Sequence, residues 1–393
     1  MKLFQVLRNE PRSLLITIMF FYYASMGVII PYMPLLLSKS VVTHQIGILM
    51  AIGSLIMILM QPVWGWLSDR LGIRLILLIT ISGTILTTVG LIKANSFFEW
   101  VLVISVYFLF QSPIGTLVDT MAITKFTKQF GSIRLWGSIG FGTFVFIGGF
   151  LIGTPIYIIH ICLLLISLLL SFLLIEPQKS KRKKISAQKS AVIFKNGHLI
   201  MILFLLFLTS VSMKGNATFY SIGLTILEVP SWLLGTAWLL QVFPEIGIFL
   251  LVDRLAKKSA AWILVIIGMI TFAIHFSLLG FYQNLWVWTL TQPLVSLAFC
   301  FWYSGSIRLI KKKVPDEYQA TGQTLFSAIC NGLGGVIGST FSGFIVSKWN
   351  VFGFYTVAGI MCAITAFLFL ILNRYGKNEK KDRDESSKLQ HTR

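Results

Sequence analysis

Long apolar runs, separated by short polar segments, make up most of this chain. About twelve of them reach the length of about 20 residues that an α-helix needs to cross a bilayer. They lie at about residues 13–37, 45–66, 73–92, 97–123, 133–153, 156–175, 198–226, 231–252, 260–282, 285–309, 321–346 and 352–372. Lipid offers no hydrogen bonds to the backbone, so such runs fold as helices. The sequence predicts an all-α integral membrane protein with twelve transmembrane helices.

Composition excludes a soluble protein and argues against a nucleic-acid binder. Hydrophobic residues make up 56% of the 393 residues and charged residues only 12%, whereas ordinary soluble domains are about 25% charged. A net charge of +19 would usually suggest nucleic acid as a partner. Here the basic residues stand in short clusters between apolar runs, so no nucleic-acid partner is expected. The four cysteines lie inside apolar runs without paired spacing, which predicts neither disulfides nor a metal site.

The basic clusters fall in every second loop. Because Lys and Arg mark cytoplasmic loops, these loops and both termini are predicted to be cytoplasmic, which requires an even number of spans. The clusters lie at residues 2–12, 70–74, 125–128, 179–184, 254–258 and 311–313.

The runs also divide into two sets of six. The predicted parts are a cytoplasmic N-terminus (1–12), a first six-helix bundle (13–175), a basic cytoplasmic linker (176–197), a second six-helix bundle (198–373) and a disordered cytoplasmic tail (374–393). Residues 253–258 occupy in the second half the place that residues 65–74 occupy in the first.

A charged turn at residues 65–74 joins the second and third runs. Its Gly65, Asp69, Arg70, Gly72 and Arg74 match the loop signature Gly-x-x-x-Asp-Arg-x-Gly-x-Arg of the major facilitator superfamily, at the place where that superfamily carries it. The chain thus resembles this superfamily. The resemblance implies two six-helix bundles, a substrate site near the midplane between them, and alternating access. It also implies a monomer without cofactors, in which the loop acts on conformational change.

Further segments narrow the resemblance. Residues 23–34, 130–141, 243–246 and 320–338 together are similar to the phenylpropionate permease branch, which lies near the nucleoside–proton symporters and the lactose permease. The resemblance implies proton-coupled import of a small organic solute such as an aromatic acid, a sugar or a nucleoside. One departure is Gln292-Pro293-Leu294-Val295, where Val295 stands in place of the histidine of that pattern and leaves the substrate open.

Two carboxylates lie clearly inside apolar runs, Asp119 and Glu245. A charge there costs about 2.5–3.5 kcal/mol on insertion scales and usually faces a cavity. Glu245 follows Pro244, which removes a backbone N–H, and it is the first candidate for the coupling proton. Asp119 is the second candidate, expected to pair with Arg134 on the neighbouring run. The alternatives are a static ion pair and a protonated glutamate that only bonds another helix.

Six polar residues inside the runs are candidates for substrate binding. Lys214 is suited to an anionic solute and His275 to proton transfer, while snorkelling and helix–helix hydrogen bonds are the structural alternatives. The full set is Arg134, Lys214, Asn216, Gln111, Gln292 and His275.

Enzyme signatures are absent from the sequence, which has no phosphate-binding Gly-x-x-x-x-Gly-Lys loop and no nucleophile motif. We therefore expect a secondary active transporter whose partners are a small solute, protons and the bilayer of a bacterial cell membrane. Three alternatives stay open. They are a proton-antiport exporter of drugs or a metabolite, a lipid or glycolipid flippase, and a non-transporting membrane sensor.

Overall fold

The structure is a computed structural model that describes residues 10–126, 129–174, 197–255, 259–314 and 319–391. The side chains of Ile246, Asp253 and Ala320, and those beyond Asn373, are outside the description. The predicted linker 176–197 and N-terminal segment 1–12 therefore fall almost entirely outside the described residues.

Every regular element in these described ranges is helical. The first half contains α2 (Pro11–Ile29), η1 (Ile30–Tyr32), α3 (Met33–Leu37), α4 (Thr43–Leu71), α5 (Ile73–Lys93), α6 (Phe97–Phe126), α7 (Phe130–Gly149) and α8 (Thr154–Ser171). The second half contains α9 (Gly197–Ile226), α10 (Ser231–Leu255), α11 (Ala261–Phe281), α12 (Leu285–Leu290), α13 (Gln292–Lys313), α14 (Gln319–Ser327), the π-helical segment η5 (Ala328–Leu333) and α15 (Gly334–His391).

Among the described residues, 11 helical stretches are long and apolar enough to cross a membrane. The chain is a multi-pass membrane protein. The last stretch, Thr321–Asn373, has 53 residues, or about 80 Å of helix at about 1.5 Å per residue. It reverses direction at Trp349 and Asn350, whose backbone angles are not helical. Asn350 has a φ of 60°, which asparagine tolerates better than most residues, and its Oδ1 accepts a hydrogen bond from the Gly353 N–H.

The signature 65–74 is less of a loop than its sequence suggests. Helix α4 continues through the charged residues to Leu71, and the chain reverses at Gly72 alone before α5 begins. Gly72 has a φ of 98°, a conformation that glycine adopts without steric cost.

Helix α15 continues to His391, and the disorder that polar composition predicts for the tail at 374–393 stays a prediction. The tail is rich in Lys, Glu and Arg, which are good helix formers.

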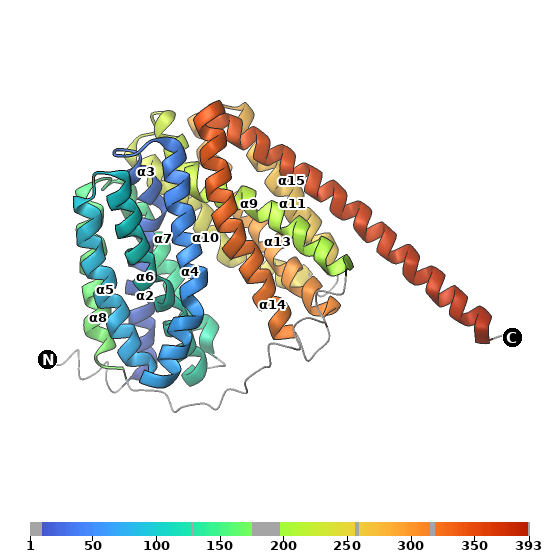
Figure 1. The fold of residues 1–393 in the computed structure, drawn as a ribbon, viewed down its shortest axis with the longest axis horizontal. Helices are drawn as coiled ribbons and strands as arrows, with labels where there is room; N and C mark the ends of the chain where they lie inside the picture. Colours follow the sequence, from blue (N-terminus) through green and yellow to red (C-terminus); the bar gives the residue numbers. More distant parts are fainter. Residues whose placement is uncertain (1–9, 127–128, 175–196, 256–258, 315–318, 392–393) are drawn as a thin grey trace.

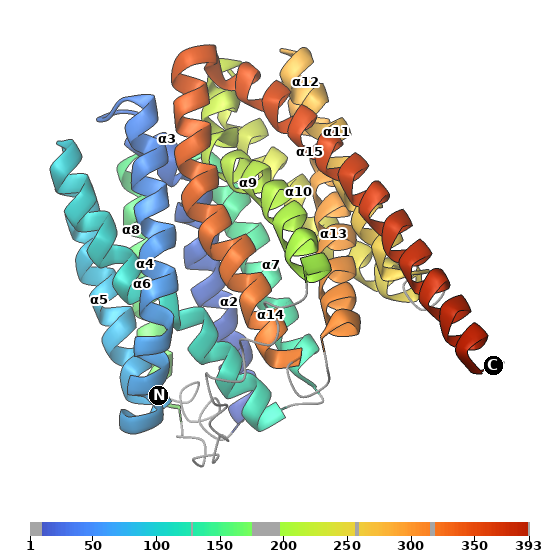
Figure 2. The same cartoon turned by 45° about the vertical axis from the view of Figure 1, so that its right-hand side comes forward.

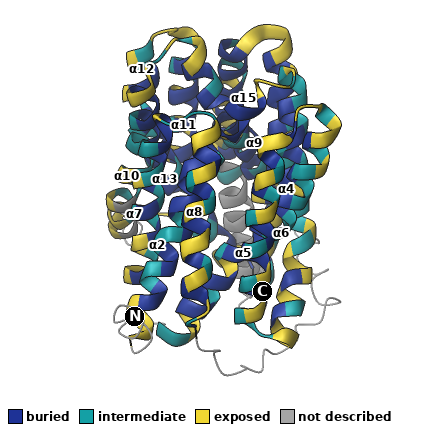
Figure 3. Cartoon of the chain, turned by 90° about the vertical axis from the view of Figure 1, so that its left-hand side faces the viewer, coloured by how far each residue is buried: buried dark blue, intermediate teal, exposed yellow. Residues whose placement is uncertain are grey.

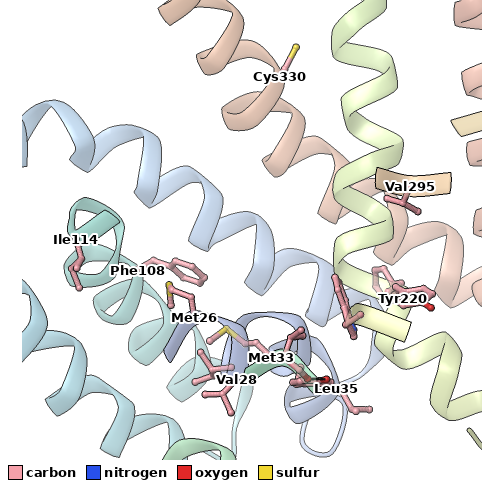
Figure 4. Packing of buried hydrophobic residues seen from close by; sticks show 14 of the residues in the cluster. Met26, Val28, Met33, Leu35, Phe108, Ile114, Tyr220, Val295 and Cys330 are labelled. Atoms are coloured by element: carbon pink, nitrogen blue, oxygen red, sulfur yellow. Dashed lines mark hydrogen bonds between the residues drawn. The ribbon is translucent and has the colours of Figure 1, made fainter. Parts of the chain in front are cut away.

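Buried residues face the interior of the bundle and exposed apolar residues face outward (Figure 3). The two halves lie beside each other (Figures 1 and 2), and the most extensive contacts between them are those of α4 with α15 and of α7 with α10. Figure 4 shows part of the buried packing, with Met26, Phe108 and Ile114 in the first half and Tyr220, Val295 and Cys330 in the second.

One end of the bundle carries Arg70, Lys125, Arg254 and Lys311–Lys313, and we call it the basic end. At the opposite end the halves touch through backbone. A Cβ on Gly149 of α7 would collide with the backbone of Gly235 on α10, and one on Gly47 of α4 with the Ser339 carbonyl on α15. The Ser221 hydroxyl on α9 also donates to the Pro31 carbonyl across the halves, at 2.6 Å.

The halves separate toward the basic end. A Cβ on Gly65, Gly131 or Gly247 would meet no heavy atom within 4 Å among the described residues. Figures 1 and 2 show the same spreading of the helices at the bottom of the molecule. Close backbone contact between the halves is therefore found at the end opposite the basic end, whereas Gly65, Gly131 and Gly247 make no such contact with the described residues.

Candidate functional site

A cavity of about 210 Å³ lies within the second half. It contains two of the charged candidates, Lys214 of α9 and Glu245 of α10, together with Asn216. Its lining residues are Met213, Lys214, Asn216, Ala217, Gln241, Glu245, Phe272, Val295, Ser296 and Phe299. Four helices build this wall, α9, α10, α11 and α13, so the site forms only when the second half is folded.

Glu245 is held by contacts between α10 and α13. The Ser296 hydroxyl donates to the main-chain carbonyl of Gln241, and one turn further the Cys300 thiol donates to the carbonyl of Glu245 at 3.7 Å. Both contacts join α13 side chains to the α10 backbone with a spacing of four residues. They anchor the turn of α10 that precedes and includes Pro244, where the proline removes one intrahelical N–H.

Lys214 lies where α15 approaches α9 most closely. A Cβ on Gly338 would lie 2.6 Å from the Val211 carbonyl and 2.9 Å from the Lys214 Cβ, so a glycine is needed for this approach. Cys330 of η5 interacts electrostatically with the Lys214 ammonium. The π-helical segment η5 therefore lies next to Lys214 in the cavity wall. Such π-helical turns are frequent at functional sites.

Asn216 lines the same cavity but has a partner. The Tyr355 hydroxyl on α15 donates to Asn216 Oδ1 at 2.8 Å, and Asn216 is buried. The amide nitrogen and the second lone pair of Oδ1 are left for the predicted substrate contact.

Asp119 of α6 and Arg134 of α7 form the predicted ion pair in the first half. Arg134 Nε lies 3.6 Å from Asp119 Oδ1, and its guanidinium stacks on the Tyr23 ring of α2 at 4.0 Å. Cation–π stacking of this kind holds the planar guanidinium in a set orientation. Arg134 also interacts electrostatically with Glu245 across the halves, although neither Arg134 nor Asp119 is among the residues that line the cavity.

Four of the six substrate-binding candidates are not lining residues of the cavity, namely Arg134 of the ion pair and three buried residues. Gln111 is buried in the first half, where its Nε2 donates to the Tyr22 hydroxyl at 3.3 Å and contacts the Met26 sulfur. Gln292 is buried at the start of α13 and donates to the Trp288 carbonyl at 2.9 Å. His275 is buried in α11 beside Phe276. None of the three is among the cavity's lining residues, because their helices turn these positions toward neighbouring helices.

Sequence reasoning missed Gln241, Ser296, Phe272 and Phe299. Gln241 precedes Glu245 by four residues and so lies on the same face of the helix. The Oε1 atom of Gln241 is buried with no hydrogen-bond partner among the described residues. That spacing was available in the sequence. The contributions of α11 and α13 were not, since they depend on how helices distant along the chain pack together.

The signature residues lie at the basic end, apart from the cavity. The Arg70 guanidinium stacks on Trp66 at 4.0 Å, and Arg74 Nη2 donates to the Phe172 carbonyl at the end of α8. A cation at a helix C-terminus is favourable for the helix dipole. Asp69 and Gly65 are exposed in this conformation.

Comparisons with known proteins give the same class. The chain is 26% identical over 375 residues to the "Uncharacterized transporter YwbF" of Bacillus subtilis (strain 168), covering 91% of this chain and 92% of that protein. It is 26% identical to the "Probable 3-phenylpropionic acid transporter" of Escherichia coli (strain K12), covering 64% and 69%. The solved structure of the nucleoside transporter NupG superposes with a TM-score of 0.84 at 16% identity, covering 93% of this chain and 99% of NupG; at this identity the likeness concerns the fold.

The model of the MFS_1 like family matches residues 13–378, which is most of the chain. The predicted resemblance to the major facilitator superfamily is confirmed. The chain belongs to the MFS_1 like family and is a membrane transporter rather than an enzyme.

Proposed function

We propose that this protein is a proton-coupled symporter that imports a small organic solute by alternating access. Its twelve spans are the 11 helical stretches with the last divided at Trp349 and Asn350. The positive-inside rule orients the basic end, and with it both termini, toward the cytoplasm. The protein works as a monomer in a bacterial cell membrane, and the described conformation is open to the cytoplasm.

One observation carries the proposal. Glu245 lines a cavity that also contains an ammonium and amide groups, and it interacts with Arg134 of the other half. In this position the Glu245 carboxyl group can exchange a proton with the cavity. When it gains or loses that proton, its electrostatic attraction to Arg134 of the other half changes. Proton binding and movement of the halves are thereby linked through a single group.

The coupling follows from the charges. With Glu245 ionised, its attraction to Arg134 favours approach of the two halves. With Glu245 protonated, that attraction is lost and Arg134 keeps its pairing with Asp119. Asp119 is the second group that a proton can neutralise, and its protonation would release Arg134 from this pair.

The test is a liposome assay of Glu245→Gln. Purified protein with a trapped pH-sensitive dye is given aromatic acids, sugars and nucleosides one at a time. The wild type should acidify the lumen as its substrate enters, and a pH difference of about one unit should drive about tenfold accumulation for one proton per solute. Glu245→Gln should lose this accumulation and retain exchange of substrate between equal pools.

The matched control is Glu99→Gln. Glu99 is exposed at the start of α6, where its Oε2 accepts hydrogen bonds from the Asn95 and Ser96 N–H groups, and glutamine can accept them as well. Full accumulation by Glu245→Gln would remove Glu245 as the coupling site. Proton movement only when solute is loaded inside would replace import by antiport export.

A further inference from the structure

The cavity contains an ammonium and a carboxyl group that do not neutralise each other. Neither Lys214 nor Glu245 takes part in an ion pair within 4 Å with a described residue, unlike Arg134 and Asp119, whose side chains pair at 3.6 Å. An unpaired charge in a mostly apolar surrounding is costly. Lys214 has no such partner, and an anionic ligand can supply the missing counter-charge.

We propose that the substrate is a monoanionic organic acid, bound through its carboxylate to Lys214 and carried with one proton on Glu245. This inference rests on the proposed function and assigns the substrate class of the same site. The anion and the proton enter together, so that the translocated complex gains no net charge and the transport step is electroneutral.

The charges around Glu245 support this assignment. Arg134 faces it from α7 and is paired with Asp119; Lys214 faces the same cavity from α9; Cys300 contacts its backbone from α13. The neighbouring α12 has no ionisable residue, and α11 contributes Phe272. With Glu245 ionised, Lys214 and Glu245 sum to zero charge. With Glu245 protonated, the cavity carries one positive charge and suits one anion.

Binding of the anion and of the proton must then favour each other. The substrate anion is repelled less when Glu245 is neutral, and by linkage the bound anion raises the affinity of Glu245 for its proton. A neutral sugar or nucleoside would leave Lys214 without a counter-charge. Its binding would also not be coupled in this way to the protonation of Glu245.

The remaining wall suits a compact acid with an apolar body. Met213, Phe272, Val295 and Phe299 are apolar, and the volume of about 210 Å³ is below the roughly 300–1,000 Å³ of sites that enclose drug-sized ligands. Two polar groups of the wall are already engaged, Asn216 Oδ1 by Tyr355 and the Ser296 hydroxyl by Gln241. Besides the two charged groups, the amides of Gln241 and Asn216 remain, which is fewer than a solute with many hydroxyls needs to make all its buried hydrogen bonds.

The experiment compares isosteric acids and amides on the purified full chain. Binding of 3-phenylpropionate and benzoate, of their amides, and of maltose and uridine is measured by thermal stabilisation, followed by uptake in liposomes. We expect an acid to bind at least tenfold more tightly than its amide. Lys214→Gln should lower acid affinity at least tenfold, Lys214→Arg should retain part of it, and Lys93→Gln, at the exposed end of α5, should leave it unchanged.

Two further measurements need no variant of the site. The affinity of the wild type for the acid should fall as pH rises and Glu245 ionises, whereas amide binding should stay constant. Uptake driven by a pH gradient should be the same at zero and at inside-negative membrane potential, set with potassium and valinomycin.

Proton-coupled uptake of maltose, uridine or an amide would overturn the substrate class and leave the symporter intact. Unchanged acid affinity in Lys214→Gln, or uptake that rises with inside-negative potential, would also overturn it. Solute flux without proton movement, unaffected by Glu245→Gln, would instead overturn the proposed function.

Discussion

At the scale of residues, Asp119 and Arg134 form an ion pair in a partly exposed position. Their side chains are 30% and 36% exposed at a separation of 3.6 Å. Ion pairs in such partly exposed positions contribute about 0.2–1 kcal/mol to stability. Stability alone is therefore a weak reason for placing two charges inside a membrane bundle.

The first prediction concerns Asp119→Asn. We expect the melting temperature to change by less than about 2 °C, because the pair contributes little and Arg134 retains its stacking on Tyr23. The initial rate of proton-coupled uptake should fall at least tenfold. Both are measured on the same preparation, by thermal unfolding and by liposome flux.

Arg134→Lys is the companion variant. It keeps the positive charge and loses the planar stacking surface, so its uptake should lie between those of the wild type and of Asp119→Asn. Uptake at the wild-type rate by Asp119→Asn would mark the pair as structural.

At the scale of elements, α4 contains glycines with opposite surroundings. Gly47 contacts α15 so closely that a Cβ would collide with the Ser339 carbonyl, whereas Gly65 has open space around it among the described residues. One end of this helix is thus packed against the other half and the other end is not.

The second prediction compares Gly47→Ala with Gly65→Ala. Gly47→Ala should be destabilising by about 1–3 kcal/mol, as for other overpacked positions, and should lower the melting temperature by several degrees. Gly65→Ala should keep or raise it, because alanine is favoured over glycine in a helix by about 0.5–1 kcal/mol. Equal destabilisation of both would contradict the separation of the halves at the basic end.

At the scale of the whole molecule, the two halves are joined by backbone contacts at one end. Backbone contacts between Gly149 and Gly235 and between Gly47 and Ser339 close the end opposite the basic one. The positive-inside rule predicts that the basic end faces the cytoplasm.

The third prediction uses single cysteines and a membrane-impermeant maleimide. With the exposed Cys162 replaced by serine, Gly131→Cys should be labelled from the cytoplasmic side of inside-out vesicles. Gly235→Cys should resist labelling from either side, since it is covered by α7. Labelling of Gly131→Cys from the periplasmic side alone would reverse the orientation.

The fold class and the family resemblance could be predicted from the sequence alone. Apolar runs were enough to predict a helical membrane protein, because the bilayer demands helices, and the signature at residues 65–74 gave the resemblance to the superfamily. The two internal carboxylates indicated a functional cavity, because the membrane penalises isolated charges. The pairing of Asp119 with Arg134 also followed, since neighbouring runs joined by a short turn must lie together.

Only the tertiary structure decided which polar residues share a cavity. Lys214 and Glu245 come from helices adjacent along the chain, but the wall that makes them neighbours includes residues of α11 and α13. Gln111, Gln292 and His275 looked equivalent to them in sequence, yet their helices turn them into buried packing. Membrane helices are apolar on all sides, so hydrophobic periodicity does not mark the inner face, and rotation of each helix is set by contacts with distant partners.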